Sequence, residues 1–263
     1  MKVIVTSDQH LGADTSDKLA FNAFLDKLQE DETLTDLVLL GDVVDMWRRD
    51  ASGVFLENYD TIQKIIALRS RGVNVFYIAG NHDYHVLDLQ RPSYPFKFLK
   101  DLELHDEGLT YRFVHGYTYD PEQKEHFMAL LCRVMSDAAG AFESSLWTEW
   151  NHIEGVLSRV YPEFARSELR AAIDRLQRAP HERLKNSVDK INAAACKDVK
   201  PNEILVFGHT HMPFINKTGN VANSGSWVTD ATPHNTYVEI IGGKPRLYIF
   251  GDKIEEITDR IQC

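Results

Sequence analysis

The most constraining stretch of this sequence is the apolar run LVLL at residues 37–40, which ends abruptly at Gly41-Asp42. Such a run is typical of a buried strand, and the glycine that follows indicates where the strand ends. Asp42 is therefore expected at the carboxyl end of a central strand, where open α/β sheets bind their ligands. An isolated Gly-Asp pair, however, is more often an ordinary strand-to-helix turn.

Four further polar clusters follow apolar runs in the same way. They are Asp8-Gln9-His10, Gly80-Asn81-His82-Asp83, His115-Gly116 and Gly208-His209-Thr210-His211. Each cluster alone is weak, because Asp-x-His is common and asparagine tolerates left-handed turns. The last cluster is the most specific, since two histidines on alternate residues after a buried strand rarely serve packing. Five such clusters in one chain outweigh the reading as ordinary turns and predict a single site.

The order of the apolar runs predicts a mixed α/β domain. Strands are expected at residues 2–6, 37–40, 73–79 and 111–114, and helices are expected between the first three of them. The first two strands and the helix between them form a βαβ unit, which predicts a parallel pair. After residue 200 the pattern is all-β. Strands are expected there at residues 203–207, 221–223, 236–241 and 246–250, with a turn at Gly242-Gly243.

A helical insertion is expected at residues 121–200. Asp120-Pro121 is typical of a helix start, and four amphipathic stripes follow without a convincing strand. The insertion carries equal numbers of acidic and basic residues, whereas the whole chain has a net charge of −10. We expect residues 1–263 to form a single domain in which this insertion caps the site.

Charge and cysteine content narrow the function classes. The net charge of −10 argues against a broad nucleic-acid surface. The odd, widely spaced cysteines favour a reducing compartment over a disulfide framework or a zinc finger. No signal peptide and no apolar run long enough for a membrane span is found, which favours a cytoplasmic protein. Peripheral membrane contact through the insertion stays open.

The residue types in the five clusters suit two divalent metal ions. Carboxylate, imidazole and amide oxygen ligands without a thiolate are typical of a catalytic metal site and not of a structural zinc site. Manganese is the favoured ion, with iron, zinc, nickel or cobalt as alternatives. Two ions about 3.5–4 Å apart can share a bridging carboxylate, activate water and hold a phosphate for in-line attack.

The five motifs together resemble those of the calcineurin-like metallophosphoesterase superfamily. The resemblance implies a β-sandwich core flanked by helices, with a helical cap, and a metal-dependent phosphoester or diphosphate hydrolase. It also implies roles for nine residues. The first ion would be held by Asp8, His10, Asp42 and His211. The second would be held by Asp42, Asn81, His115 and His209. His82 would protonate the leaving oxygen, and Asp45 would orient its imidazole.

The segment from Gly41 to Trp47 narrows the resemblance to one branch. Superfamily protein phosphatases carry a phosphate-binding arginine at the position of Met46. Gly-Asp-Val-Val-Asp-Met-Trp and a later Asn-x-Gly-Ser-Trp (residues 223–227) are instead similar to the UDP-2,3-diacylglucosamine hydrolases. The lipid A enzymes of that branch have arginine where this chain has His82, and aspartate where it has Tyr117.

The substrate favoured by this branch is a nucleotide-diphospho conjugate, either free or lipid-linked. A broad-specificity nucleotide phosphodiesterase or phosphomonoesterase is the enzymatic alternative, and a catalytically silent metal-binding scaffold is the alternative outside enzymes. Four arginines are candidates for binding the substrate's phosphates. They are Arg48, Arg49, Arg166 and Arg170.

Overall fold

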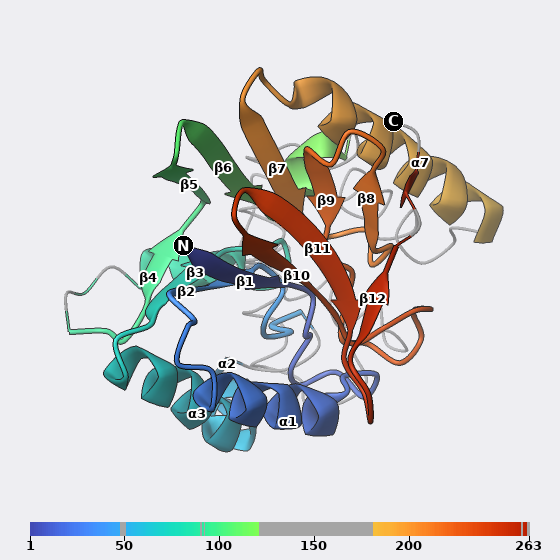
Figure 1. Cartoon of the computed structure of the whole chain (residues 1–263). Helices are drawn as coiled ribbons and strands as arrows, with labels where there is room; N and C mark the ends of the chain where they lie inside the picture. The colour runs from blue at the N-terminus through green and yellow to red at the C-terminus, as the bar shows by residue number, and fades with distance from the viewer. Residues whose placement is uncertain (48–50, 90, 92, 121–180, 259, 262–263) are drawn as a thin grey trace.

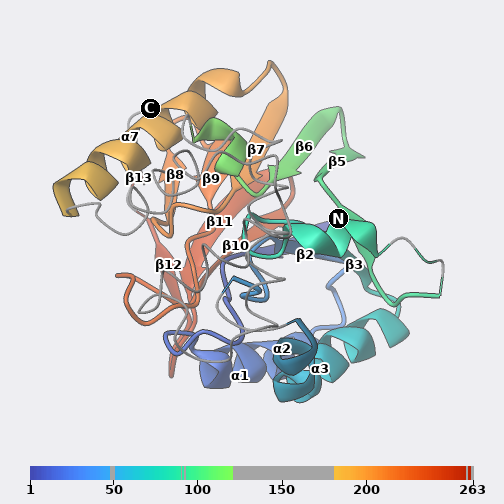
Figure 2. The ribbon, with the colours of Figure 1, turned by 180° about the vertical axis from the view of Figure 1, so that it is seen from behind.

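The computed structural model describes residues 1–47, 51–89, 91, 93–120, 181–258 and 260–261. In these residues two β-sheets pack face to face, and helices cover the outer face of each sheet (Figure 1). The same layers are seen from behind in Figure 2. This arrangement confirms the predicted α/β class and the β-sandwich core.

The first sheet has seven strands and contains the predicted βαβ unit. Its strands lie in the order β12 (Glu255–Ile257), β11 (Lys244–Ile249), β10 (Thr236–Ile241), β1 (Lys2–Thr6), β2 (Asp36–Leu40), β3 (Asn74–Ile78) and β4 (Lys97–Leu99). The strands β1, β2 and β3 run parallel, with Val5 opposite Val38 and Val38 opposite Phe76. Their carboxyl ends therefore lie at the same edge of the sheet.

The second sheet has six strands. Their order is β13 (Arg260–Ile261), β8 (Phe214–Asn216), β9 (Val221–Asn223), β7 (Glu203–Phe207), β6 (Leu109–Val114) and β5 (Asp101–Asp106). The strands β6 and β7 are parallel, and Tyr111 lies opposite Ile204. This second parallel pair delivers the fourth and fifth polar clusters from one edge, as β1, β2 and β3 deliver the first three.

The core lies in three layers. Between the sheets, Val5 and Leu40 of the first pack with Phe113 and Val206 of the second. The other face of the first sheet is covered by α1 (Lys18–Gln29), α2 (Ala51–Glu57) and α3 (Tyr59–Ser70). The other face of the second sheet is covered by α7 (His181–Asp198). Because β2 is covered on both faces, all five of its residues are buried, which explains its uninterrupted apolar run.

Some boundaries and elements differ from the prediction. The strand predicted at residues 111–114 begins already at Leu109, and α1 begins after the N-cap Asp17, whose side chain accepts the Ala20 N–H. The pattern missed α2 and the short strands β4, β5, β8, β12 and β13. In β5, exposed and half-buried residues alternate and several are charged, so the strand carries no apolar signal. Its existence depends on its pairing with β6.

The insertion is described only at its carboxyl end. Its fourth predicted stripe lies on α7, where Ile191 and Ala195 are buried against the second sheet. The other three stripes, and with them the expected cap, lie outside the described residues. Cys196 of α7 is disulfide-bonded, which the widely spaced cysteines did not predict. Among the described helices, none is both long enough and apolar enough to cross a membrane.

Candidate metal centre

The five polar clusters come together where the carboxyl ends of β1, β2, β3, β6 and β7 lie. Backbone hydrogen bonds join the loops that follow these strands. The N–H groups of Asp8 and His10 donate to the carbonyl oxygens of Gly41 (3.0 Å) and Asp42 (2.9 Å). On the second sheet, the Gly208 N–H donates to the His115 carbonyl (2.8 Å). These hydrogen bonds hold neighbouring loops together along one rim. They fix the backbone positions from which the polar side chains extend.

Several residues of the rim have left-handed backbone conformations, which residues other than glycine rarely adopt. Five of its residues other than glycine have positive φ: Asp8 (55°), His10 (47°), Asp42 (52°), His209 (68°) and His211 (56°). Such a conformation costs on the order of 1–2 kcal/mol for an ordinary residue, and it persists only where surrounding contacts enforce it. Its concentration on one rim is typical of a functional site, because the strained backbone aims the side chains inward.

Two glycines allow the loops to approach this closely. A Cβ added at Gly80 would overlap the carboxylate and the backbone nitrogen of Asp42. A Cβ added at Gly208 would overlap Ser7 and the Asp8 carboxylate. In the sequence these glycines mark only the ends of strands. Their second role, leaving room for a carboxylate of a neighbouring loop, depends on tertiary contacts.

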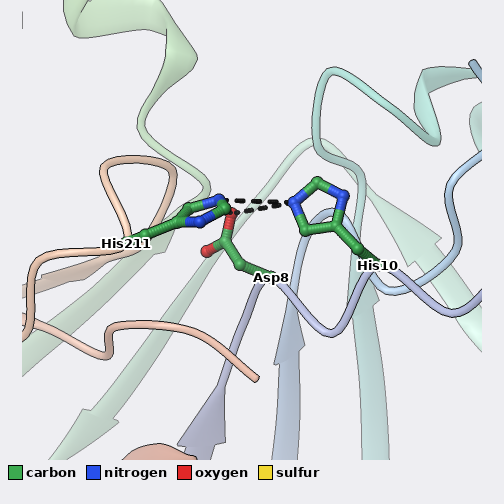
Figure 3. Close-up of side chains that lie close together, drawn as sticks. All are labelled: Asp8, His10 and His211. Carbon is green, nitrogen blue, oxygen red and sulfur yellow. Dashed lines mark hydrogen bonds and ion pairs between the residues drawn. The ribbon is translucent and has the colours of Figure 1, made fainter. Parts of the chain in front are cut away.

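One ligand cluster consists of Asp8, His10 and His211 (Figure 3). The two histidine Nε2 atoms lie 3.3 Å apart, and Asp8 Oδ1 lies 3.2 Å from Nε2 of His211 and 3.9 Å from Nε2 of His10. Asp8 is fully buried, and its Oδ1 accepts no hydrogen bond. A buried carboxylate oxygen with no donor, facing two imidazole nitrogens, fits a divalent cation.

A second cluster consists of Asp42, Asn81, His115 and His209. The Asn81 Oδ1 lies 3.2 Å from Nε2 of His115 and 3.0 Å from Nδ1 of His209, and Asp42 Oδ2 lies 3.3 Å from His115 Nε2. The Nδ1–H of His115 donates to the Leu40 carbonyl (2.8 Å). This hydrogen bond keeps the proton of a neutral His115 on Nδ1 and leaves Nε2 available as a ligand.

Asp42 lies between the two clusters. Its Oδ2 is 3.3 Å from His115 in the second cluster and 3.7 Å from His10 in the first. Its other oxygen, Oδ1, accepts the backbone N–H of His82 at 2.7 Å, which fixes the carboxylate in place. This is the position that a bridging carboxylate needs.

His82 and Asp45 form a pair beside the first cluster. The His82 Nδ1 lies 3.1 Å from Asp45 Oδ1, while Asp45 Oδ2 lies 3.4 Å from Nδ1 of His10. Asp45 is buried, and its two carboxylate oxygens face the imidazoles of His82 and His10. These three side chains are also close enough together to be considered as a cation site. The contact with Asp45 orients the imidazole of His82 within the centre.

The buried carboxylates set the electrostatics of the centre. Burial disfavours their charge, but His115 and His211 lower the pKa of Asp8 to about 2, and His115 and His82 lower the pKa of Asp42 well below its usual range. Burial also disfavours a charged His115, yet Asp42 and Asp8 raise its pKa to about 10. In the metal-free protein His115 is therefore protonated at neutral pH, and this proton compensates part of the negative charge.

Metal binding is accordingly expected to release a proton from His115. Because a raised pKa means that the protonated form persists up to about pH 10, the affinity for an ion on His115 should increase with pH. We expect about a tenfold increase per pH unit between pH 7 and pH 9, since one proton is displaced. Competition with a chelator at each pH measures this affinity. An affinity independent of pH across this range would contradict the assignment.

No role for Asp83 was expected from the sequence, and the structure places this residue directly behind the centre. Its Oδ2 accepts the Tyr77 hydroxyl (2.7 Å) and the Val43 N–H (2.8 Å), and its Oδ1 accepts the Gly80 N–H (2.7 Å). Burial and the nearby Asp42 raise its pKa to about 6. Asp83 thus joins the loops after β2 and β3. Only its place in the Gly-Asn-His-Asp motif could have pointed to it.

The later motif at residues 223–227 makes hydrogen bonds that hold the neighbouring loops of the centre in place. The Asn223 side chain donates to the Gly208 carbonyl (2.8 Å) and to Thr210 Oγ1 (3.1 Å). The indole N–H of Trp227 donates to Thr6 Oγ1 (2.6 Å), and its ring packs on Phe21. In this structure the motif holds the last metal-ligand loop and packs in the core.

The structure brings together all nine residues expected at the metals and at the leaving group: Asp8, His10, Asp42, Asp45, Asn81, His82, His115, His209 and His211. The four candidate phosphate-binding arginines, Arg48, Arg49, Arg166 and Arg170, lie outside the described residues.

Comparison with known proteins gives a family match. Residues 1–213 match the family Metallophos, described as calcineurin-like phosphoesterase. No curated protein matches the sequence. Solved structures with a similar fold include a Vps29 single mutant from Entamoeba histolytica (13% identity, TM-score 0.45, 98% of each chain covered). A dimetal phosphatase from Danio rerio (9% identity, TM-score 0.44) covers 97% of this chain and 95% of its own. A predicted phosphoesterase from Streptococcus pneumoniae TIGR4 (14% identity, TM-score 0.40) covers 98% and 97%.

Proposed function

Because the chain belongs to the calcineurin-like phosphoesterase family, it is a metal-dependent phosphoester hydrolase, and we propose that its substrate is a nucleotide-diphospho conjugate. The observation that carries the metal-dependent part is the position of Asp42 Oδ2, between His115 at 3.3 Å and His10 at 3.7 Å. A single buried carboxylate between two groups of nitrogen and oxygen donors is the arrangement that a pair of divalent ions requires.

We assign the ligands from this geometry. The first ion would be held by Asp8, His10, Asp42 and His211, and the second by Asp42, Asn81, His115 and His209. Manganese is the ion we propose, because the donors are oxygens and imidazoles without a thiolate. When bound, the two ions supply Lewis acidity toward the phosphate and lower the pKa of water.

His82 is assigned as the general acid. Its Nδ1 is directed to Asp45 Oδ1, so its Nε2 can carry the proton that the leaving oxygen receives. The buried Asp45 keeps a low pKa despite its burial, because the neighbouring His82 and His10 favour its charged form. Asp45 therefore stabilises a protonated His82 and holds its ring in one orientation.

The proposed substrate class rests on what the rim lacks. The described rim loops at residues 7–13, 41–47, 79–84, 115–120 and 208–213 contain neither lysine nor arginine. At the position of the phosphatase arginine, Met46 is buried. A second phosphate group would therefore need a cation from elsewhere in the chain. The similarity to the UDP-2,3-diacylglucosamine hydrolase branch supports a cap that carries it, and we propose Arg166 and Arg170, together with Arg48 and Arg49, which directly follow Trp47 in the sequence.

A substrate panel tests this proposal. The manganese-loaded protein should hydrolyse nucleotide-diphospho conjugates with a higher kcat/KM than cyclic nucleotides or phosphomonoesters. Arg166→Ala and Arg170→Ala should each cost about 1.5–3 kcal/mol in kcat/KM on diphosphates, the worth of a charged hydrogen bond. Small aryl phosphates, which need no second phosphate contact, should be hydrolysed as before.

Arg246, an exposed arginine of β11, provides the matched control, and Arg246→Ala should leave both substrate classes unchanged. If Arg166→Ala and Arg170→Ala lower kcat/KM equally on aryl phosphates and diphosphates, these arginines do not bind the second phosphate. Comparable kcat/KM values for diphosphates, cyclic nucleotides and monoesters would favour the broad-specificity alternative.

A further inference from the structure

The imidazole of His82 is enclosed by aromatic rings. The indole of Trp47 stacks on it with ring centroids 4.2 Å apart and planes only 19° from parallel. The ring of His10 meets it edge-on, at 4.7 Å and 90°. Asp45 contacts its Nδ1 from a third direction. Such a ring has few orientations left to it, because stacking fixes its plane and the carboxylate fixes its rotation.

Trp47 is itself held in place by the residues it helps to position. It is buried, with 7% of its surface exposed. Its backbone N–H donates to Asp45 Oδ1 at 3.1 Å, the same oxygen that contacts His82. The Met46 N–H donates to the His82 carbonyl at 3.3 Å. Residues 45–47 thus wrap around His82 with backbone and side-chain contacts.

We propose that Trp47 is a positioning residue for His82, and that its indole makes the protein effective on phosphoester bonds whose leaving oxygen must be protonated, such as alkyl, sugar and nucleoside oxygens. A phosphate that leaves from a diphosphate bond needs no such proton. This inference rests on the proposed function, because it presumes that His82 delivers the proton. It explains why a large apolar ring is buried next to a polar centre. Burying it there excludes water from one face of the imidazole and confines the ring to one plane.

Proton transfer from His82 depends on where its ring lies at the moment when the leaving oxygen departs. An acid contributes only when its proton lies within hydrogen-bond reach of the leaving oxygen, and a displacement of about 1 Å can cost about 10²-fold in rate. The contact with Asp45 alone fixes Nδ1 but lets the ring swing about that point. The indole face removes this freedom. The rate for a leaving group that departs without a proton does not depend on the orientation of the His82 ring.

The first test compares the 4-nitrophenyl and methyl esters of one nucleoside 5′-phosphate. Nitrophenolate leaves without a proton, whereas methoxide needs one. Trp47→Leu should lower kcat for the methyl ester by about 10–100-fold, with KM and the content of two metal ions unchanged, and lower kcat for the nitrophenyl ester by less than about threefold. Trp47→Phe, which keeps a flat ring, should recover most of the methyl-ester rate.

The second test detects the stacking of Trp47 on His82 in solution and does not depend on catalytic activity. In the zinc-loaded wild-type protein, NMR signals of the His82 ring protons should lie upfield, because they sit over the indole face. The signals are identified by their loss in His82→Gln. Signals at ordinary positions would overturn the proposal even if Trp47→Leu does not fold.

Equal losses on both esters, or a Trp47→Phe variant no better than Trp47→Leu, would also overturn it. These results differ from a failure of the proposed function itself. If the wild-type protein loaded with metal hydrolyses neither ester, the function fails. If it hydrolyses both and Trp47→Leu affects them equally, only the role of Trp47 fails.

Discussion

Replacing Asp42 with alanine is expected to reduce phosphoester hydrolysis to near background, a loss of about 10³-fold or more. The substitution removes a carboxylate whose Oδ2 lies close to both His10 and His115, at 3.7 Å and 3.3 Å. It also leaves the His82 N–H without its acceptor. The repulsion between two divalent ions would then have no shared anion to offset it. Metal analysis after dialysis should find fewer than two ions per chain.

Two variants make this result specific. Asp36 also carries a buried carboxylate on β2, but it lies at the opposite end of the strand and accepts from Thr35 and Asn74. Asp36→Ala should lower the melting temperature while keeping two ions per chain. Asp42→Asn keeps an acceptor for His82 but loses the charge, and should remain close to Asp42→Ala in activity. Substantial turnover by Asp42→Ala at ordinary metal concentrations would contradict the two-ion reading.

The sequence could predict which residues would meet, because strand direction determines it. The apolar runs before Asp8, Asp42 and Asn81 form parallel strands, whose carboxyl ends share an edge. His115 and His209 likewise follow a parallel pair, β6 and β7, although the sequence predicted no pairing between these two strands. A cluster of polar residues after each run is a local signal. Their convergence follows from topology without any knowledge of side-chain contacts.

The supporting contacts could not be predicted, because they depend on loops far apart in the chain. Gly80 is needed for the Asp42 carboxylate beside it, and Asp83 joins the Val43 N–H to the Tyr77 hydroxyl. The stacking of Trp47 on His82 joins residues 35 positions apart. No period or composition encodes such pairs. The peripheral strand β5 was not predicted for a related reason. It is defined by its pairing with β6, and its residues form no apolar run.

The two sheets contribute unequal chemistry to the centre. The first sheet supplies the carboxylates Asp8, Asp42 and Asp45, and the second supplies the imidazoles of His115 and His209. The raised pKa of His115 results from this opposition, because its ring faces two buried carboxylates across the sandwich. The protonated His115 offsets only part of the charge of these carboxylates, so the site keeps an excess of negative charge that divalent cations would balance.

Replacing His82 with alanine is expected to slow hydrolysis of the methyl ester by about 10²–10⁴-fold, the usual worth of acid–base catalysis. The loss should shrink to less than about tenfold for the 4-nitrophenyl ester, because nitrophenolate leaves without a proton. The content of two metal ions should not change, since the His82 side chain is directed to Asp45 while its backbone N–H, which alanine keeps, donates to Asp42.

His105 provides the matched control, because it is exposed on β5 and contacts only the Thr110 hydroxyl among the hydrogen bonds described for its ring. His105→Ala should change neither ester's rate nor the metal content. If His82→Ala loses a metal ion, then His82 is a ligand and the acid must be sought elsewhere. If it keeps both ions but slows both esters equally, His82 instead stabilises the charge on the phosphate in the transition state, and Asp45 serves that role through the same 3.1 Å contact.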